Sequence, residues 1–192
     1  MRVRVLATFL LCVGSVLLGA EKAAPSVQQV TVDASKSNVQ FELSAVLHTV
    51  HGGFKVKSST IHFDTATGKA SGQIIVDLTS GDTGVPERDR HMHEDVLESA
   101  RFPEAVFSPD LVTGPVLPEG EHQVGVRGTL RIHGQNHEIS VPVLVKVRAG
   151  QAVATAKFVV PYLAWGMKDP STFVLRVSDK AEVTVNLVGT IQ

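Results

Sequence analysis

The side chains that could carry chemistry gather in one segment, residues 87–103. Arg88, Asp89 and His91 fall within four positions of it, among further charged residues. An arginine presents a planar pair of donors to phosphate or carbonyl oxygens, and a histidine beside carboxylates could transfer protons. Two plainer interpretations stand beside these. The charges could form a solvated helix face, or Arg88 or His91 could tie the helix to the protein through Asp89.

Histidines could also bind a metal ion, but their spacing does not favour it. The pairs to consider are His91 with His93, His48 with His51, and His133 with His137. Two residues apart on a helix, His91 and His93 point to nearly opposite sides. Of the other pairs, only the one at 133 and 137 has a carboxylate beside it, Glu138. Exposed polar histidines are the simpler interpretation, and we expect no metal and no cofactor.

Catalytic signatures are missing from the sequence. It has no G-x-S-x-G elbow, no phosphate-binding glycine loop and no H-E-x-x-H pattern. The only cysteine is Cys12, near the N-terminus. We therefore expect a binding protein rather than an enzyme. The formal net charge of −1 argues against nucleic acid or an anionic membrane surface as an electrostatic partner.

The N-terminus is typical of a secretory signal peptide. Arg2 and Arg4 precede an apolar run over residues 5–18, and Gly19-Ala20 supplies small residues for cleavage. The run is short for a transmembrane helix, which needs about 20 residues, although an uncleaved anchor is the alternative. We predict a signal peptide at 1–20, a flexible lead-in at 21–29, and a periplasmic or secreted protein with no stable membrane anchor after cleavage.

Most of the remaining chain alternates between apolar and polar residues in the manner of β-strands. Val39, Phe41 and Leu43 alternate with polar neighbours, and so does the stretch 139–147. A period of two buries one face of a strand. About eight to ten strands joined by short turns, with the last at 173–177 and 181–191, predict an all-β sandwich or an antiparallel barrel.

One helix interrupts this pattern, predicted to begin at Pro86 and to end at Phe102-Pro103. Proline suits the first turn of a helix, where its missing N–H is not needed. Met92 and Val96 lie four residues apart and form a narrow apolar stripe. We therefore expect the helix to lie on the surface of the β-structure. Residues 161–172 should form an irregular loop that carries the single Trp165.

An ordered set of motifs resembles the YceI-like family of exported, lipocalin-like proteins. The matching segments are 32–41 (VDASKSNVQF), 50–54 (VHGGF), 87–92 (ERDRHM) with FP at 102–103 and FS at 107–108, and 128–134 (GTLRIHG). The resemblance spans residues 30–191, so we assign one domain to 30–192. It implies an antiparallel lipocalin-like β-barrel of about eight strands with one short helix. It also implies that the long pocket of the barrel holds an isoprenoid, a quinone or a similar amphiphilic lipid.

The residues expected to contact such a ligand fall into two groups. Those expected to line the barrel interior are Phe41, Leu43, Phe54, Phe63, Phe107 and Leu130. The remaining candidates, nearer the helix and the irregular loop, are Arg88, His91, Met92, Phe102 and Trp165. A closed barrel of about eight strands can hold one small ligand, but the same side chains could simply fill the interior. Trp165 could gate the barrel mouth, touch a membrane or plug the core.

Two further functions stay open at this point. One is a β-structured interaction or stress module with a filled interior. The other is a metal-assisted hydrolase that uses the histidines. The sequence also leaves a homodimer open. Whether the interior is hollow separates the lipid carrier from the interaction module.

Overall fold

The computed structural model describes residues 27–46, 48–115, 118–171 and 176–192. The predicted signal peptide and most of the lead-in lie outside the described residues, and the first strand begins at Val27. The strands are β1 (Val27–Val32), β2 (Asn38–Ser44), β3 (Thr49–Asp64), β4 (Ala70–Asp82), β5 (Glu104–Thr113), β6 (Gly120–Ile132), β7 (Gln135–Arg148), β8 (Gln151–Val160) and β9 (Ala181–Ile191). The helical elements are η1 (Ala34–Lys36), α1 (Pro86–His91) and η2 (Met92–Val96).

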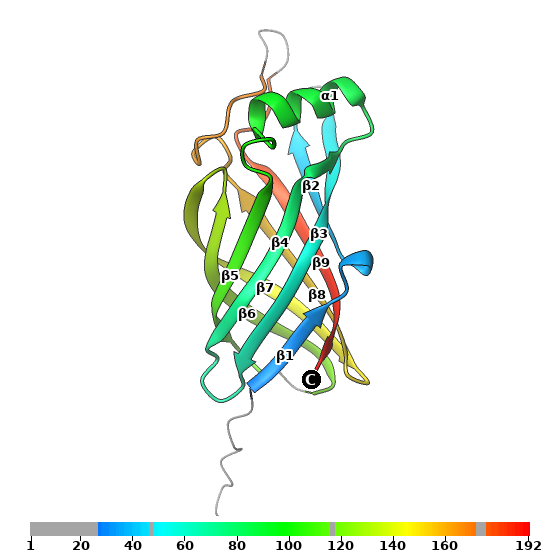
Figure 1. Ribbon diagram of the computed structural model, residues 1–192, viewed down its shortest axis with the longest axis vertical. Coiled ribbons are helices and arrows are strands. Elements are labelled where there is room, and N and C mark those ends of the chain that lie inside the picture. Colours follow the sequence, from blue (N-terminus) through cyan, green and yellow to red (C-terminus); the bar gives the residue numbers. More distant parts are fainter. Residues whose placement is uncertain (1–26, 47, 116–117, 172–175) are drawn as a thin grey trace, which may run out of the picture.

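The strands form one closed antiparallel barrel (Figure 1). From β2 the order of neighbours is β9, β8, β7, β6, β5, β4 and β3, and β3 pairs again with β2. β1 also lies between β3 and β9, so β1 and β2 together occupy one position and nine strands make an eight-position barrel. The predicted fold class is confirmed. Among the described residues, each strand position therefore has a paired neighbour on both sides.

The break between β1 and β2 is held by a buried hydroxyl. Asp33 caps η1 by accepting a hydrogen bond from the Ser35 amide. Ser37 then donates to the Asp33 carbonyl at 2.7 Å and accepts from the Val188 amide at 2.9 Å. The Ser37 hydroxyl therefore stands in for the backbone partner that β9 lacks where the strand position is interrupted.

The helix is shorter than predicted. α1 ends at His91 and continues as the π-helical turn η2, in which the Leu97 amide donates to the Met92 carbonyl five residues back. Glu98 then adopts a left-handed φ of 46°, which ends the helix. Phe102-Pro103 therefore follows a separate turn, and the prediction that it ends the helix was wrong.

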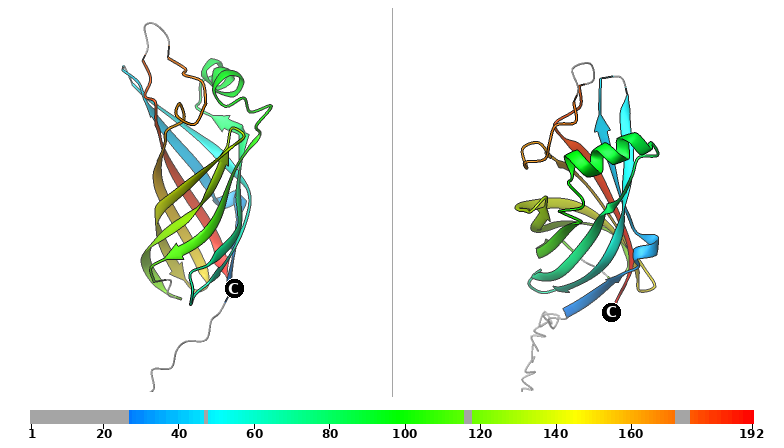
Figure 2. Two further views of the ribbon diagram at one scale, coloured as in Figure 1. Left: turned by 90° about the vertical axis from the view of Figure 1, so that its left-hand side faces the viewer. Right: turned by 45° about the horizontal axis from the view of Figure 1, so that its top comes forward.

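The irregular loop after β8 agrees with the sequence. Residues 162–166 form turns between β8 and β9. The predicted strand at 173–177 falls largely outside the described residues, and Val177 makes only an isolated bridge with Ala45. The helix and this loop lie at the same end of the barrel (Figure 2). No helix among the described residues is long and apolar enough to cross a membrane.

We predict that Ser37→Ala lowers the free energy of unfolding by about 1–3 kcal/mol, because the Val188 amide loses its buried partner. Ser35→Ala is the matched control. The exposed Ser35 hydroxyl only bonds the Asp33 carboxylate, which keeps its backbone donor, so the expected change is within about 0.5 kcal/mol. Urea unfolding measures both. Equal effects of the two variants would contradict the role given to Ser37.

Candidate functional site: an apolar cavity in the barrel

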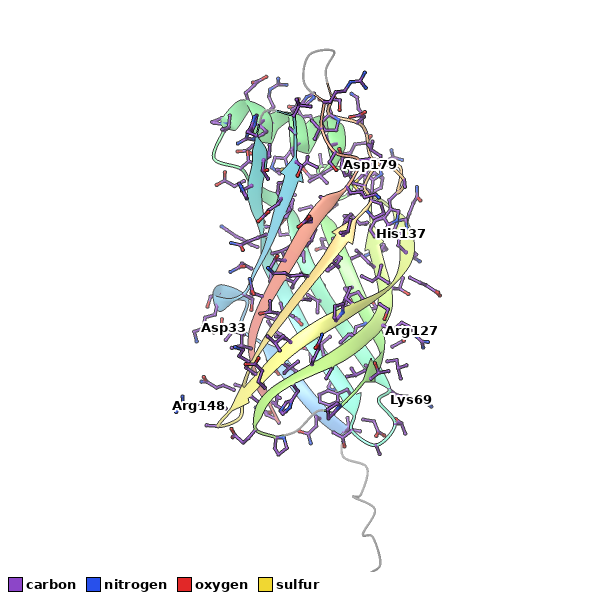
Figure 3. The ribbon with its side chains drawn as sticks, turned by 180° about the vertical axis from the view of Figure 1, so that it is seen from behind. Asp33, Lys69, Arg127, His137, Arg148 and Asp179 are labelled. Carbon is purple, nitrogen blue, oxygen red and sulfur yellow. The ribbon has the colours of Figure 1, made fainter. Side chains whose placement is uncertain are left out.

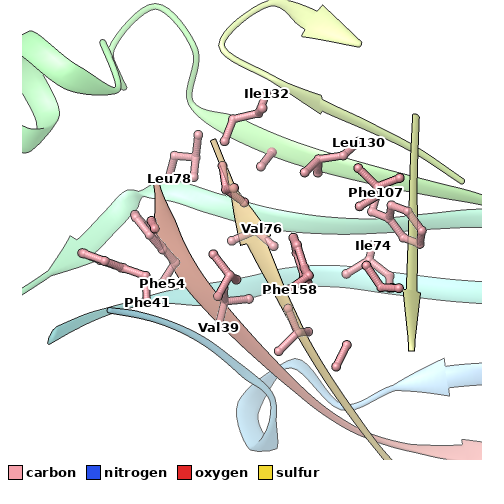
Figure 4. Close-up of a pocket in the computed structure, with 18 of the residues that line it drawn as sticks. Val39, Phe41, Phe54, Ile74, Val76, Leu78, Phe107, Leu130, Ile132 and Phe158 are labelled. Carbon is pink, nitrogen blue, oxygen red and sulfur yellow. The ribbon is translucent and has the colours of Figure 1, made fainter. Parts of the chain in front are cut away.

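The barrel encloses a cavity of about 860 Å³ that runs along its length. Each strand position contributes its inward residues to the lining, as the period of two requires. Figure 4 shows Phe41 and Phe54 nearer the helix, with Ile74 and Phe107 farther along the bore. The charged side chains point out of the wall, as Arg127 and Arg148 do (Figure 3). The interior is therefore hollow and apolar, which contradicts the alternative of a filled interior.

Two phenyl rings are seated against inward glycines, which keeps them out of the bore. A Cβ on Gly52 would lie 2.5 Å from ring carbons of Phe41. A Cβ on Gly128 would lie 2.8 Å from the tip of the Phe107 ring. Phe41 is the direct cross-strand partner of Gly52. Phe107 pairs with Leu130, two residues from Gly128 on the same face of β6. Large side chains can thus cover the wall without filling the interior.

Polarity in the lining is confined to one end of the cavity. The polar side chains among the lining residues are His48, Thr83, Glu87, Arg88, His91 and Tyr162. Tyr162 is buried, and its hydroxyl donates to the Ser178 carbonyl at 2.6 Å. Burial raises the pKa of Tyr162 to about 12. The others belong to α1, to the segment before it or to the turn after β2, so the helix end is the mouth of the cavity.

His93 fixes the helix to the wall, a role that the sequence did not reveal. Its Nε2 lies 3.0 Å from the Gly81 carbonyl, and its Nδ1 lies 2.9 Å from the Ser99 hydroxyl. A carbonyl only accepts, so Nε2 carries the proton and Nδ1 accepts from Ser99 when the ring is neutral. Gly81 permits this close approach, because a Cβ there would lie 3.1 Å from the His93 ring and 2.7 Å from Met92.

Arg88 and Asp89 are both held by Thr83. Arg88 donates from Nε to the Thr83 hydroxyl at 2.8 Å and from Nη2 to the Thr83 carbonyl at 3.1 Å. The Thr83 amide and hydroxyl both donate to Asp89. Burial opposes ionisation of Asp89, but the bonds from Thr83 outweigh it and lower its pKa. Arg88 and Asp89 were predicted to fix the helix to the rest of the protein. Their hydrogen bonds instead go to Thr83, in the segment just before α1, and not to the barrel wall.

Asp95 links the helix to the loop after β8. One of its oxygens pairs with His91, and the other accepts from Lys168 at 2.8 Å. The hydrogen bond from Lys168 is the main reason that the pKa of Asp95 is lowered. The imidazole of His91 is half exposed, at 48%. His91 thus pairs with a helix neighbour at the rim, and the Asp95–Lys168 ion pair connects the helix to the loop after β8.

Two of the predicted contact residues do not line the cavity. Trp165 stacks on His137 with ring centroids 4.0 Å apart and planes 10° apart, and burial lowers the pKa of His137. Phe102 packs on His133, with ring centroids 4.5 Å apart. Both rings belong to the structure around the β6–β7 hairpin. The other nine candidates border the cavity: Phe41, Leu43, Phe54, Phe63, Arg88, His91, Met92, Phe107 and Leu130. Their contact with a ligand stays a prediction.

The histidines do not assemble a metal site in the part of the chain that the structure describes. No group of three or more histidine, cysteine, aspartate or glutamate side chains converges there. His91 and His93 have separate partners, as their spacing indicated. His137 stacks on Trp165, whereas His133 packs on Phe102 with the ring planes 52° apart.

Comparison with known proteins places this barrel in a family. The model of the YceI-like domain matches residues 30–189. The chain belongs to the YceI-like family. The resemblance that the motifs indicated is therefore confirmed. A UPF0312 protein from Vibrio campbellii is 27% identical over 108 residues, and this match covers 55% of each chain, so the alignment spans about half the length of that relative.

Solved structures share the YceI-like fold. BcnA from Burkholderia cenocepacia superposes with a TM-score of 0.68 at 22% identity, covering 83% of this chain and 99% of BcnA. A polyisoprenoid-binding domain from Saccharophagus degradans gives a TM-score of 0.65 at 19% identity, covering 85% of this chain and 98% of that domain. At these identities the likeness shows the fold alone.

We predict that His93→Ala lowers the free energy of unfolding by about 2–4 kcal/mol, because the buried Ser99 hydroxyl and the Gly81 carbonyl lose their partner. Amide hydrogen exchange at residues 88–97 should also become faster. His91→Ala removes only a rim pair, which is worth about 0–1 kcal/mol. Slow exchange of the helix amides in the His93 variant would contradict the anchoring role.

Proposed function

We propose that this protein binds an amphiphilic lipid by enclosing its apolar chain in the barrel cavity. The supporting observation is the continuous apolar bore of about 860 Å³ with polar side chains at one end only. An isoprenoid, a quinone lipid or a long acyl chain matches this shape. The polyisoprenoid-binding domain from Saccharophagus degradans, which has the same fold, supports the isoprenoid class.

The size of the cavity makes an occupant energetically important. Apolar side chains that face an unfilled space lack the contacts that an occupant would make with them, and a bore of about 860 Å³ presents many such side chains. Water is a poor occupant, because the walls offer it few hydrogen-bond partners. Burial of each methylene of a lipid chain contributes about 0.8 kcal/mol of favourable free energy, so a lipid chain is the favoured occupant.

The proposed activity is binding without catalysis. The charged groups at the mouth are engaged with one another or with Thr83, as described above. The sequence of residues 1–20 supports export, which would give the protein a periplasmic or secreted location. In that location it would carry or store a lipid that water does not dissolve.

We predict that Ala156→Phe weakens binding of the apolar dye N-phenyl-1-naphthylamine, because Ala156 lines the bore and a phenyl ring there obstructs it. Val159→Phe, on the exposed outer face of the same strand, is the control and should bind normally. Fluorescence titration of delipidated protein should show a loss of about tenfold or more in the first variant. Thermal unfolding should show that both variants fold. Unchanged dye binding by folded Ala156→Phe would contradict a ligand in the bore.

A further inference from the structure

One basic side chain at the mouth of the cavity makes no ion pair among the described residues. The basic residues of α1 are Arg88, Arg90 and His91. Arg90 pairs with Glu87 and Glu94 on the exposed face, and His91 pairs with Asp95. Among the described residues, no carboxylate lies within 4.0 Å of the Arg88 guanidinium, whose hydrogen bonds go only to Thr83. Arg88 is also the member of the three that is not exposed.

We propose that Arg88 binds the anionic head group, a carboxylate or a phosphate, of the lipid whose chain fills the barrel. This inference rests on the proposed function, and it assigns the chemical class of the head group and its place. Arg88 lines the cavity at its polar end. A chain enclosed by the apolar walls must therefore end beside this guanidinium.

The guanidinium is held in position before any ligand arrives. Thr83 accepts from Nε and Nη2, and Asp89 accepts in turn from the Thr83 amide and hydroxyl. Nη1 donates to no described residue, and Nη2 keeps a second hydrogen beyond the one given to Thr83. Both amino groups can therefore donate to the oxygens of a carboxylate or phosphate.

The electrostatic surroundings are compatible with an anion. Glu87 also borders the mouth, but Arg90 holds its carboxylate and lowers its pKa. Asp95 is shared between His91 and Lys168. Asp89 is turned to Thr83, and Arg88 favours its charged form through space without contacting it. Arg88 is thus the one of the three basic helix residues that makes no direct ion pair among the described residues.

The test compares three probes that share a sixteen-carbon chain: hexadecanoic acid, hexadecyl phosphate and 1-hexadecanol. Delipidated full-length chain is titrated by displacement of N-phenyl-1-naphthylamine. A charge-assisted hydrogen bond should make at least one anionic probe bind about 10–100-fold more tightly than the alcohol. The better of the two anions identifies the head group.

Arg88→Gln should bring the ratio of the anion affinity to the 1-hexadecanol affinity close to one, which is the quantity that reports the head-group contact. Arg90→Gln is the matched control, because it removes one positive charge from the same helix at a site outside the lining. If Arg88→Gln unfolds the helix, Arg88→Lys serves as the second variant. Lysine keeps the positive charge but lacks the paired donors of the guanidinium, so it should retain only part of the preference for the anionic probe over the alcohol.

Three results would overturn the inference. Equal affinity of the wild-type protein for the alcohol and both anions would remove the head-group site and leave the proposed function standing. An equal loss of preference in the Arg88 and Arg90 variants would show a general field effect instead of a contact. Failure of all three probes to bind would overturn the proposed function together with the head-group site.

Discussion

The interior of this barrel can hold nothing that requires a hydrogen bond along most of its length. Closure of β3 onto both β4 and β2 uses the backbone groups of the wall, and the period of two places valine, leucine, isoleucine and phenylalanine inside. Phe41 and Phe107 would block the bore if they extended into it. The two rings pack against Gly52 and Gly128. These large apolar side chains therefore line the wall and leave the space inside the barrel open. An apolar chain is the occupant that this arrangement accepts.

The same constraint confines polar recognition to the helix end. α1 and η2 are attached by His93, which reaches Gly81 and Ser99, and by Asp95, which reaches Lys168. The π-helical turn adds a residue to the helix where these contacts are made, a feature often found at functional sites. The helix and the loop after β8 meet at the mouth through the Asp95–Lys168 ion pair. The segment first noticed for its charge and histidines is therefore best understood as the cover of the cavity.

Sequence reasoning recovered the architecture but not the contacts that fix the mouth. Strict alternation, as at Val39, Phe41 and Leu43, is enough to predict strands with one buried face, and the ordered motifs indicated the barrel. The hollow interior could not be inferred from the sequence, because inward phenylalanines can fill a barrel. The structure shows that Phe41 and Phe107 instead pack against glycines of the wall. The end of the helix was misplaced because the left-handed backbone of Glu98 has no sequence signal in a non-glycine residue. Trp165 and Phe102 were assigned to the ligand by their residue type, whereas each packs on a histidine ring that is distant in sequence.

The central claim is that the barrel encloses one lipid molecule per chain. Native mass spectrometry tests it directly: the full-length protein is delipidated, incubated with a membrane lipid extract, separated from free lipid and weighed under non-denaturing conditions. The account predicts a second species, heavier by the mass of one amphiphile, whose ligand is released when the protein is denatured. A single species with the mass of the bare chain, before delipidation and after incubation alike, would contradict it.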